Sequence, residues 1–228
     1  MVHKSDKRVT LYLVRHGETT FNANFQVQGW SDTPLTEKGV KGAEVLGKKL
    51  AMIPFKKAYA SDLGRAIKTA RLLINLSKKQ TLELTELIEL REWHYGGFEG
   101  RDDAFMWGII FESQGLTYDP AFSQLKALTE KVTEAEIAEI IQTNDATKTA
   151  ESYLEIVTRV KQGIEKIIAE MIALGGGNAL IVTHGMTILT ILKLFVAEPV
   201  EALELPNCSV TTLVIENGRI YLETLGEQ

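Results

Sequence analysis

Residues 9–22 read VTLYLVRHGETTFN. The first six of these residues, 9–14, are almost all apolar, which is the pattern of a β-strand covered on both faces. Arg15 and His16 follow directly, so they are expected at the carboxyl end of that strand. In open α/β sheets, ligands lie in the crevice beyond the carboxyl ends of the strands. The stretch therefore predicts a buried strand and the first two candidate functional residues.

Helical and strand patterns alternate along the rest of the chain. We predict a helix over about 36–52 with Thr36 as its N-cap, a brief strand at 58–60, a helix capped by Asp62, a long helix over 151–174, a strand at 179–182 that leads into a helix, and two closing strands at 209–216 and 219–225. Asn217-Gly218 between the closing strands is a strong hairpin signal. This order predicts an α/β layered fold with a mostly parallel central sheet flanked by helices.

Residues 102–146 interrupt the alternation, because short helices or loops are expected there and no clear strand. The stretch contains nine acidic and two basic residues, a net charge of −7. We interpret about 101–147 as an inserted helical cap over one end of the sheet, within a single domain of residues 1–228. An ordinary solvated helical face would have a similar composition, and the charge count alone does not separate the two.

The composition excludes several classes of protein. The chain has 228 residues, 45% of them hydrophobic and 24% charged, which indicates a globular protein. A net charge of −5 with scattered basic residues argues against a nucleic-acid partner. The apolar run at 179–197 is interrupted by His184 and Lys193, so a buried strand and helix explain it better than a membrane span. Cys208 is the only cysteine, so no intrachain disulfide forms and the cytoplasm is the expected compartment.

Polar residues follow three of the expected strands. Arg15-His16 follows the first, the stretch 61–65 with Arg65 follows the second, and His184-Gly185 follows the strand at 179–182. Two imidazoles and two guanidiniums can therefore converge at one edge of the sheet. A guanidinium matches phosphate geometry, and an imidazole can donate to a phosphoryl group or attack it. This combination favours a pocket for a phosphoryl group.

Four motifs in order resemble those of the histidine phosphatase superfamily, the phosphoglycerate mutase-like group. The motifs are RHGETTFN at 15–22 with GWSDTPLTEKG at 29–39, SDLGRA at 61–66, LRE at 90–92 with GGFEG at 96–100, and VTHG at 182–185. Arg-His-Gly alone is a weak signal, whereas four ordered motifs at strand ends are a strong one. The resemblance implies that family's layered fold and a reaction on phosphate esters.

The resemblance also implies roles for individual residues. His16 corresponds to the nucleophile, which takes the phosphoryl group as a phosphohistidine. Phosphate-binding roles are implied for Arg15, Asn22, Arg65, His184 and Gly185, and His184 is counted with the catalytic residues. Because these cations would neutralise the phosphoryl oxygens, the resemblance implies neither a metal nor another cofactor. His16 and His184 could otherwise ligate a metal, but the HExxH spacing is missing.

An acid–base residue is expected in the third motif. Glu92 corresponds to the family's proton donor, and Glu89 and Glu99 are nearby competitors. Substrate contacts are also expected around this site, although each of these residues could instead pack in the fold: Gln28, Gly29, Trp30, His94 and Tyr95.

Three functions remain open. We prefer a phosphomonoester hydrolase that acts on a phosphorylated small molecule through a phosphohistidine, since an acidic cap repels a substrate with a second anionic group. The alternative is a cofactor-dependent phosphoglycerate mutase, although Trp93 stands where mutases of the group typically have arginine. A non-catalytic phosphate-binding module is the third hypothesis. Cys208 lacks the arginine of a cysteine phosphatase loop and is expected to be a small buried residue. The sequence names no substrate and gives no sign of an oligomeric state.

Overall fold

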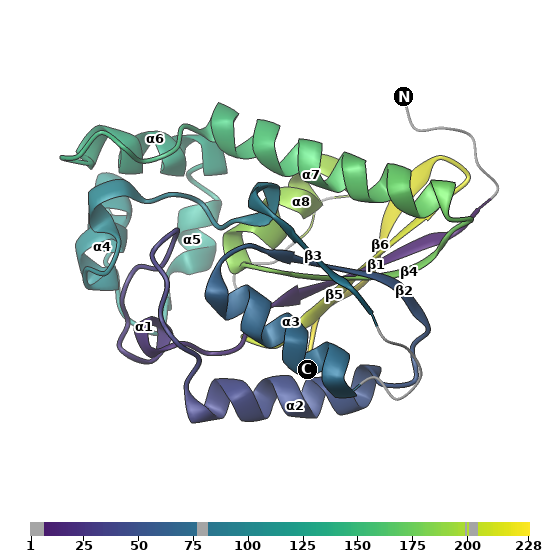
Figure 1. Cartoon of the computed structure of the whole chain (residues 1–228). Coiled ribbons are helices and arrows are strands. Elements are labelled where there is room, and N and C mark those ends of the chain that lie inside the picture. Colours follow the sequence, from purple (N-terminus) through teal and green to yellow (C-terminus); the bar gives the residue numbers. More distant parts are fainter. Residues whose placement is uncertain (1–6, 77–81, 199, 201–204) are drawn as a thin grey trace.

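The centre of the molecule is a twisted β-sheet (Figure 1). The computed structural model describes residues 7–76, 82–198, 200 and 205–228, and in this part of the chain six strands form one sheet in the order β3-β2-β4-β1-β5-β6. Their bounds are Val9–Arg15 (β1), Phe55–Ser61 (β2), Leu84–Leu87 (β3), Gly177–Thr183 (β4), Val210–Glu216 (β5) and Arg219–Glu227 (β6).

Four strands of the sheet are parallel. β1 pairs with β4, and β2 pairs with both β4 and β3, all in parallel. β5 and β6 form the expected antiparallel hairpin on the other side of β1. Asn217 and Gly218 in its turn have φ of 53° and 74°, the left-handed conformation that such a turn requires. The predicted α/β fold with a mostly parallel sheet is confirmed.

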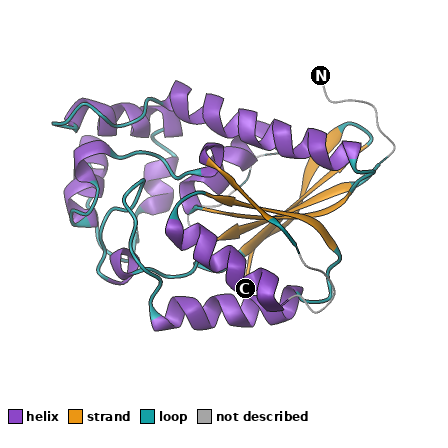
Figure 2. Ribbon diagram, viewed as in Figure 1, coloured by secondary structure: helices purple, strands orange, loops and turns teal. Residues whose placement is uncertain are grey.

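Helices cover both faces of the sheet, so the molecule has three layers (Figure 2). On one face lie α2 (Glu37–Leu50) and α3 (Gly64–Leu76), and on the other α7 (Tyr153–Ala173) and α8 (Gly185–Phe195). Alternate residues of β1 supply the two cores, because Leu13 packs in the cluster with α7 and α8, and Val14 packs in the cluster with α2 and α3.

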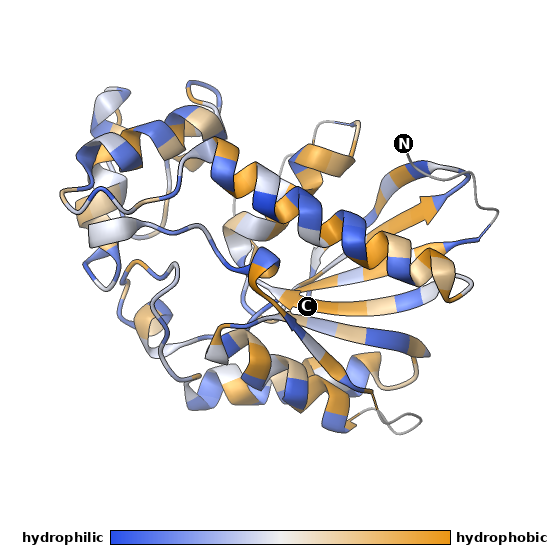
Figure 3. Cartoon of the chain, turned by 45° about the horizontal axis from the view of Figure 1, so that its top comes forward, coloured by the Kyte–Doolittle hydropathy of each residue, from blue (hydrophilic) through white to orange (hydrophobic). Residues whose placement is uncertain are grey.

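The longest helix, α7, is amphipathic, as its alternating hydrophilic and hydrophobic residues show (Figure 3). Ser152 and Glu155 form a capping box at its start, and Ile156, Val160 and Ile164 are among its buried residues. The helix predicted over 151–174 is therefore confirmed to within two residues. The run at 179–197 consists mainly of β4 and α8, and no helix in the described residues is both long and apolar enough to cross a bilayer.

The strand predicted at 58–60 is confirmed and is longer, over Phe55–Ser61. β3 was not predicted, because its four residues are ordered by pairing with β2 at the sheet edge. One local prediction is wrong. Asp62 does not cap α3, since its carboxylate accepts two hydrogen bonds from Arg91. Asp32, from a distant loop, instead accepts a hydrogen bond from the backbone N–H of Arg65 in the first turn of α3.

The remaining helices gather beyond the carboxyl ends of β1 and β4 (Figure 1). The α-helices are α1 (Thr20–Ala23), α4 (Asp103–Ser113), α5 (Leu125–Thr129) and α6 (Glu134–Asn144), and the 3₁₀ helices are η1 (Ile88–Leu90) and η2 (Gly96–Phe98). The stretch predicted as a helical cap thus contains three α-helices and no strand within 103–144, all of which the structure describes.

Candidate active site

A cavity of about 180 Å³ opens where β1 ends. Seven residues singled out in the sequence line it: Arg15, His16, Asn22, Gln28, Glu92, Tyr95 and Gly185. They come from the end of β1, from α1 and the loop after it, from the loop between η1 and η2, and from the first turn of α8. The fold therefore brings residues that are more than 160 positions apart in the sequence to one cavity.

His16 is buried with a defined tautomer. Its Nδ1 lies 2.8 Å from the carbonyl oxygen of Gly17, and because a carbonyl only accepts, Nδ1 carries the hydrogen. Nε2 is then the nitrogen with the free electron pair. Burial first, and then the nearby guanidiniums of Arg65 and Arg15, hold the pKa of His16 well below its ordinary value. The ring is therefore neutral and able to act as a nucleophile near pH 7.

Arg65 is the closest cation to that nitrogen. Its Nε donates to His16 Nε2 at 3.3 Å. The rest of the guanidinium is held in place by the carbonyls of Gly29 (2.7 Å) and Ser31 (2.9 Å) and by the carboxylate of Asp32 (3.0 Å). The Arg65 side chain is fully buried, so its position is fixed before any ligand binds.

His184 completes this cluster from the end of β4. Its ring centroid lies 5.1 Å from that of His16. The residue is fully buried, yet neither ring nitrogen has a hydrogen-bond partner in the described part of the chain. Buried polar groups are almost always paired, so an orphaned imidazole beside His16 indicates a place for a polar ligand. Burial lowers the pKa of His184 well below its ordinary value, with Arg65 and His16 adding to the effect.

Arg15 and Asn22 line the cavity together with His16. A guanidinium nitrogen of Arg15 donates to the carbonyl of Leu205. Asn22 belongs to the capping box of α1, in which its side-chain oxygen accepts from the N–H of Thr19 at 3.2 Å. This bond orients the Asn22 amide. Because Asn22 lines the cavity, its NH₂ group is left to donate to a ligand there.

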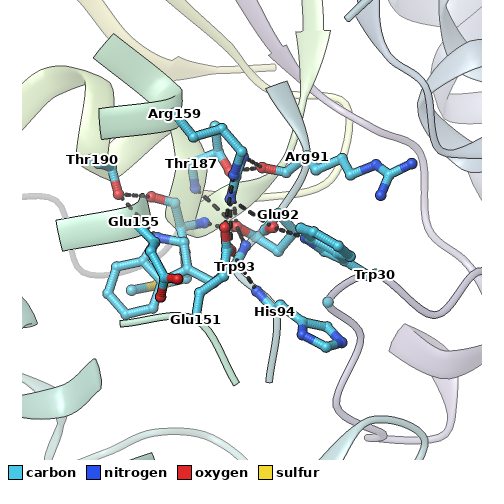
Figure 4. Close-up of polar contacts among 12 residues, drawn as sticks. Trp30, Arg91, Glu92, Trp93, His94, Glu151, Glu155, Arg159, Thr187 and Thr190 are labelled. Carbon is cyan, nitrogen blue, oxygen red and sulfur yellow. Dashed lines mark hydrogen bonds and ion pairs between the residues drawn. The ribbon is translucent and has the colours of Figure 1, made fainter. Parts of the chain in front are cut away.

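Glu92 is a buried carboxyl in the loop between η1 and η2, and its side chain meets the first turn of α8 (Figure 4). Its Oε1 accepts from the backbone N–H groups of Trp93 (3.1 Å) and Thr187 (3.0 Å) and from the Thr187 hydroxyl (3.0 Å), and its Oε2 accepts from the N–H of Met186 (3.1 Å). Burial raises the pKa of Glu92 and outweighs these hydrogen bonds, which lower it. A carboxyl in this state can give and take a proton.

The two competing glutamates do not line the cavity. Glu99 accepts from the backbone N–H groups of Trp30, Ser31 and Tyr95, so it shapes the loop that holds Arg65. Glu89 faces α7, where its carboxylate lies 3.9 Å from Lys166. Of the three glutamates, Glu92 is the one placed beside His16.

Three residues expected to contact substrate lie elsewhere. The rings of Trp30 and His94 pack against each other at 4.6 Å in a separate surface hollow beside α7. A Cβ at Gly29 would come within 2.3 Å of the carbonyl oxygen of Trp93, so this glycine permits a close approach of two loops. Trp30 Nε1 donates to the carbonyl oxygen of Glu92 (Figure 4), and Trp30 is not among the residues that line the cavity.

Two residues that support Glu92 were missed in the sequence. Arg159 on α7 donates to the carbonyls of Glu89, Arg91 and Glu92 and forms an ion pair with Glu151 (Figure 4). The Thr187 hydroxyl contacts the carbonyl of Arg91 at 2.8 Å as well as Glu92. In the sequence, Arg159 is one more charged residue on an amphipathic helix, and only its position three residues after Ile156 hints at partial burial.

Comparison with known proteins accounts for this arrangement. Residues 11–107 and 116–228 match the profile of the histidine phosphatase superfamily (branch 1). The chain belongs to this superfamily. The predicted resemblance is thereby confirmed, and the motifs that carried it are the segments that surround His16.

Relatives in the superfamily have different names. A 2,3-bisphosphoglycerate-dependent phosphoglycerate mutase from Streptococcus thermophilus is 42% identical over 98 residues, which are 42% of this chain and 43% of that protein. The match thus spans less than half the length of this curated relative. A crystal structure of phosphoglycerate mutase from Bacillus anthracis is 39% identical with a TM-score of 0.88, covering 99% of this chain and 96% of the other.

A third relative supports the fold of this chain and nothing beyond it. The structure of a putative alpha-ribazole-5'-P phosphatase from Escherichia coli has a TM-score of 0.68 at 23% identity, covering 96% of each chain. The names of these relatives thus include both a mutase and a phosphatase. Within the described residues, no three His, Cys, Asp or Glu side chains are grouped to hold a metal ion.

Proposed function

We propose that the protein is a phosphomonoester hydrolase that acts on a phosphorylated small molecule in the cytoplasm. The observation that carries the proposal is the contact of the free nitrogen of His16 with the fixed guanidinium of Arg65, beside the unpartnered ring of His184. A tetrahedral phosphoryl group placed there would meet a nucleophile and several donors at once.

In the first half-reaction, a phosphoryl oxygen replaces His16 Nε2 as the acceptor of the Arg65 Nε–H. The freed electron pair of Nε2 attacks phosphorus, a P–N bond forms, and the P–O bond to the leaving group breaks. The leaving oxygen takes the proton of Glu92, while Arg15, Asn22, Arg65 and His184 stabilise the phosphoryl oxygens. The products are an alcohol and a phosphohistidine.

In the second half-reaction, Glu92 acts as a base. A water molecule gives a proton to the Glu92 carboxylate as its oxygen attacks phosphorus, and the P–N bond breaks to release inorganic phosphate. Glu92 is protonated and His16 is neutral again, so the cycle is balanced. The raised pKa of Glu92 suits both steps, because the carboxyl must change its protonation state at each of them.

Hydrolysis of 4-nitrophenyl phosphate by the pure protein tests this proposal, and we expect it to be insensitive to EDTA. The cations that neutralise the phosphoryl oxygens are the side chains of Arg15 and Arg65, which a chelator does not remove. The measurement is the rate before and after dialysis against EDTA, with dialysis into plain buffer as the control. A rate that disappears with EDTA and returns with a divalent cation would contradict the mechanism.

A phosphoglycerate mutase is the second candidate, favoured by the names of the relatives from Streptococcus thermophilus and Bacillus anthracis. Interconversion of 2- and 3-phosphoglycerate by the pure protein, faster than phosphate release, would support it. Phosphate binding without turnover of any ester would instead support a non-catalytic module. Trp93, where mutases of the group typically have arginine, lies in the core with its indole donating to Thr190.

The structure narrows the argument that an acidic cap would repel the substrate of a mutase. Of the nine acidic residues counted in the cap, Asp103 lines the cavity in the described structure, while others serve the fold. Asp145, for example, accepts from the backbone N–H groups of Gly97, Thr149 and Ala150. The net charge of the cap therefore overstates the repulsion of an anionic substrate, and what matters is which side chains face the cavity.

Thr187→Val is expected to raise the pKa of Glu92 further, because it removes a hydroxyl donor to the ionised carboxylate but keeps the backbone N–H. As a proton donor, Glu92 works below its pKa, so the alkaline limb of kcat/KM for an alkyl phosphate should move to higher pH. The pH profile measures this shift. The control is Thr190→Val, because Thr190 lies one turn along α8 and makes no contact with the Glu92 carboxylate. If the alkaline limb of kcat/KM lies at the same pH in the two variants, Thr187 does not have this role.

A further inference from the structure

Much of the cavity wall is apolar and partly aromatic. Its apolar side chains come from the loop after α1, the loop between η1 and η2, α4, the segment before α5, α5 itself, α8 and the segment before β5: Val27, Tyr95, Met106, Trp107, Phe122, Leu125, Met186, Leu189 and Leu205. A substrate whose phosphoryl group lies against His16 would therefore place its leaving group among hydrocarbon and aromatic side chains.

Phe122, one of the residues in this wall, has a strained backbone conformation. Its φ is 51°, a left-handed conformation that a bulky residue adopts rarely and that stores strain. The ring is nevertheless held in edge-on contacts with Trp107 at 5.4 Å and Tyr118 at 5.1 Å. These contacts hold the ring of Phe122 in place beside the cavity.

The basic residues of the same region point away from the cavity. The guanidinium of Arg101 lies over the ring of Phe105 at 3.6 Å, Lys131 donates to the carbonyl of Gln114, and Lys148 donates to the carbonyl of Thr143. Lys126 is exposed and borders a different groove, between α5 and α8. Among the described residues that line the cavity, the charged side chain on the apolar side is the acidic Asp103.

The volume sets a further limit. A cavity of about 180 Å³ is smaller than the ~300–1,000 Å³ typical of pockets for larger ligands. A dry cavity of roughly 150 Å³ is enough for one benzene ring. The enclosed space therefore has room for about one ring or a short alkyl chain, and the rest of a substrate would extend from its open side.

We infer that the preferred substrates are phosphate monoesters of small apolar alcohols or phenols without a second negative charge, and that Asp103 disfavours an anionic leaving group. This inference rests on the proposed hydrolase function and specifies its substrate class. The apolar wall gains free energy by desolvating hydrocarbon. The hydroxyls of a sugar would find few partners there, because the cavity-lining amides of Gln26 and Gln28 already bond to Gly100, Thr19 and Thr33. The carboxylate of Asp103 repels a carboxylate or second phosphate in the same space.

The first test compares cyclohexylmethyl phosphate with glucose 6-phosphate, which share a phosphorylated primary alcohol on a six-membered ring. We expect kcat/KM to be at least about tenfold higher for the hydrocarbon ring. Equal values, or a preference for the sugar, would overturn the apolar part of the inference.

The second test varies charge on one aryl framework. The substrates are 4-ethylphenyl phosphate and its analogues with a terminal carboxylate or ammonium group, assayed with the wild type, Asp103→Asn and Asp102→Asn. Asp102 is a matched control because it is the adjacent acid, lies outside the cavity lining and caps α4, which asparagine also does well. Thermal unfolding checks that each variant is folded.

We expect the wild type to favour the neutral over the carboxylate substrate by about tenfold, with the ammonium substrate at least as good as the neutral one. Asp103→Asn should reduce this discrimination by at least about threefold, and Asp102→Asn should leave it unchanged. Equal discrimination in the wild type and Asp103→Asn would overturn the role of Asp103.

The two proposals fail in different ways. If 4-nitrophenyl phosphate is not hydrolysed by the folded wild type, the hydrolase function itself is wrong. If it is hydrolysed but the matched substrates show no preference, the hydrolase function stands and the inferred substrate class is wrong.

Discussion

His16→Ala is expected to lower kcat/KM for 4-nitrophenyl phosphate by at least about 10³-fold, because it removes the atom that attacks phosphorus. The neighbouring imidazole of His184 does not replace it, since in this mechanism His184 donates to the phosphoryl oxygens, and its ring centroid lies 5.1 Å from that of His16. The variant should also form no phosphoenzyme. The measurements are steady-state rates and intact-mass spectrometry of samples quenched in base, in which phosphohistidine is stable.

Two controls separate chemistry from folding. His16 is buried and contacts Arg65, so its replacement by alanine leaves a cavity. Thermal unfolding must therefore show that His16→Ala and His16→Asn are both folded. In the wild type, the trapped phosphoryl group should be lost in acid and retained in base. Residual activity above about a tenth of the wild type in a folded variant, or a phosphoryl group on another residue, would show that His16 is not the nucleophile.

Glu92→Gln is expected to produce a burst of about one equivalent of 4-nitrophenol, followed by a steady state that is slower by about 10²-fold or more. The first step needs little proton donation, since 4-nitrophenolate is a good leaving group. The second step needs a base for the attacking water, and glutamine is not one. The phosphohistidine should therefore accumulate, and stopped-flow absorbance with mass spectrometry measures both effects.

The same variant should also change the pH dependence with an alkyl phosphate. In the wild type, phosphoryl transfer to His16 should fall as the pH rises through the raised pKa of Glu92, because the proton donor is lost. Glu92→Gln should lack this limb. Glu89→Gln is the matched control, since Glu89 lies only three residues before Glu92 but its carboxylate faces Lys166 at 3.9 Å and is outside the cavity lining. A burst in the control, or none in Glu92→Gln, would assign the proton transfers to another group.

Much of the architecture was predictable because its signals are local. The apolar run before Arg15, the Asn217-Gly218 turn and the amphipathic pattern of α7 each need only neighbouring residues to be recognised. The short β3 could not be predicted in this way, since Glu86 and Thr85 become a strand through pairing with β2. Asp62 likewise had the local pattern of an N-cap, but its ion pair with Arg91 prevailed.

The sequence identified the main residues of the candidate site better than it identified the role of each one. Arg15 ends a buried strand, and His16 and His184 each follow one directly. Parallel strands present their carboxyl ends at one edge, so the sequence alone determined that these side chains meet. The same sequence determined the superfamily through its four ordered motifs. Neither conclusion needed a long-range contact between particular side chains.

The tertiary structure decided which neighbouring residues face the cavity. Glu92 lines it and Glu89 and Glu99 do not, Tyr95 lines it and His94 does not, and Asp103 lines it and Asp102 does not. These differences depend on the direction of single side chains within irregular loops and first helical turns, which is set by distant partners such as Arg159 and Thr187. Because those partners lie 67 and 95 positions from Glu92, no local pattern records them.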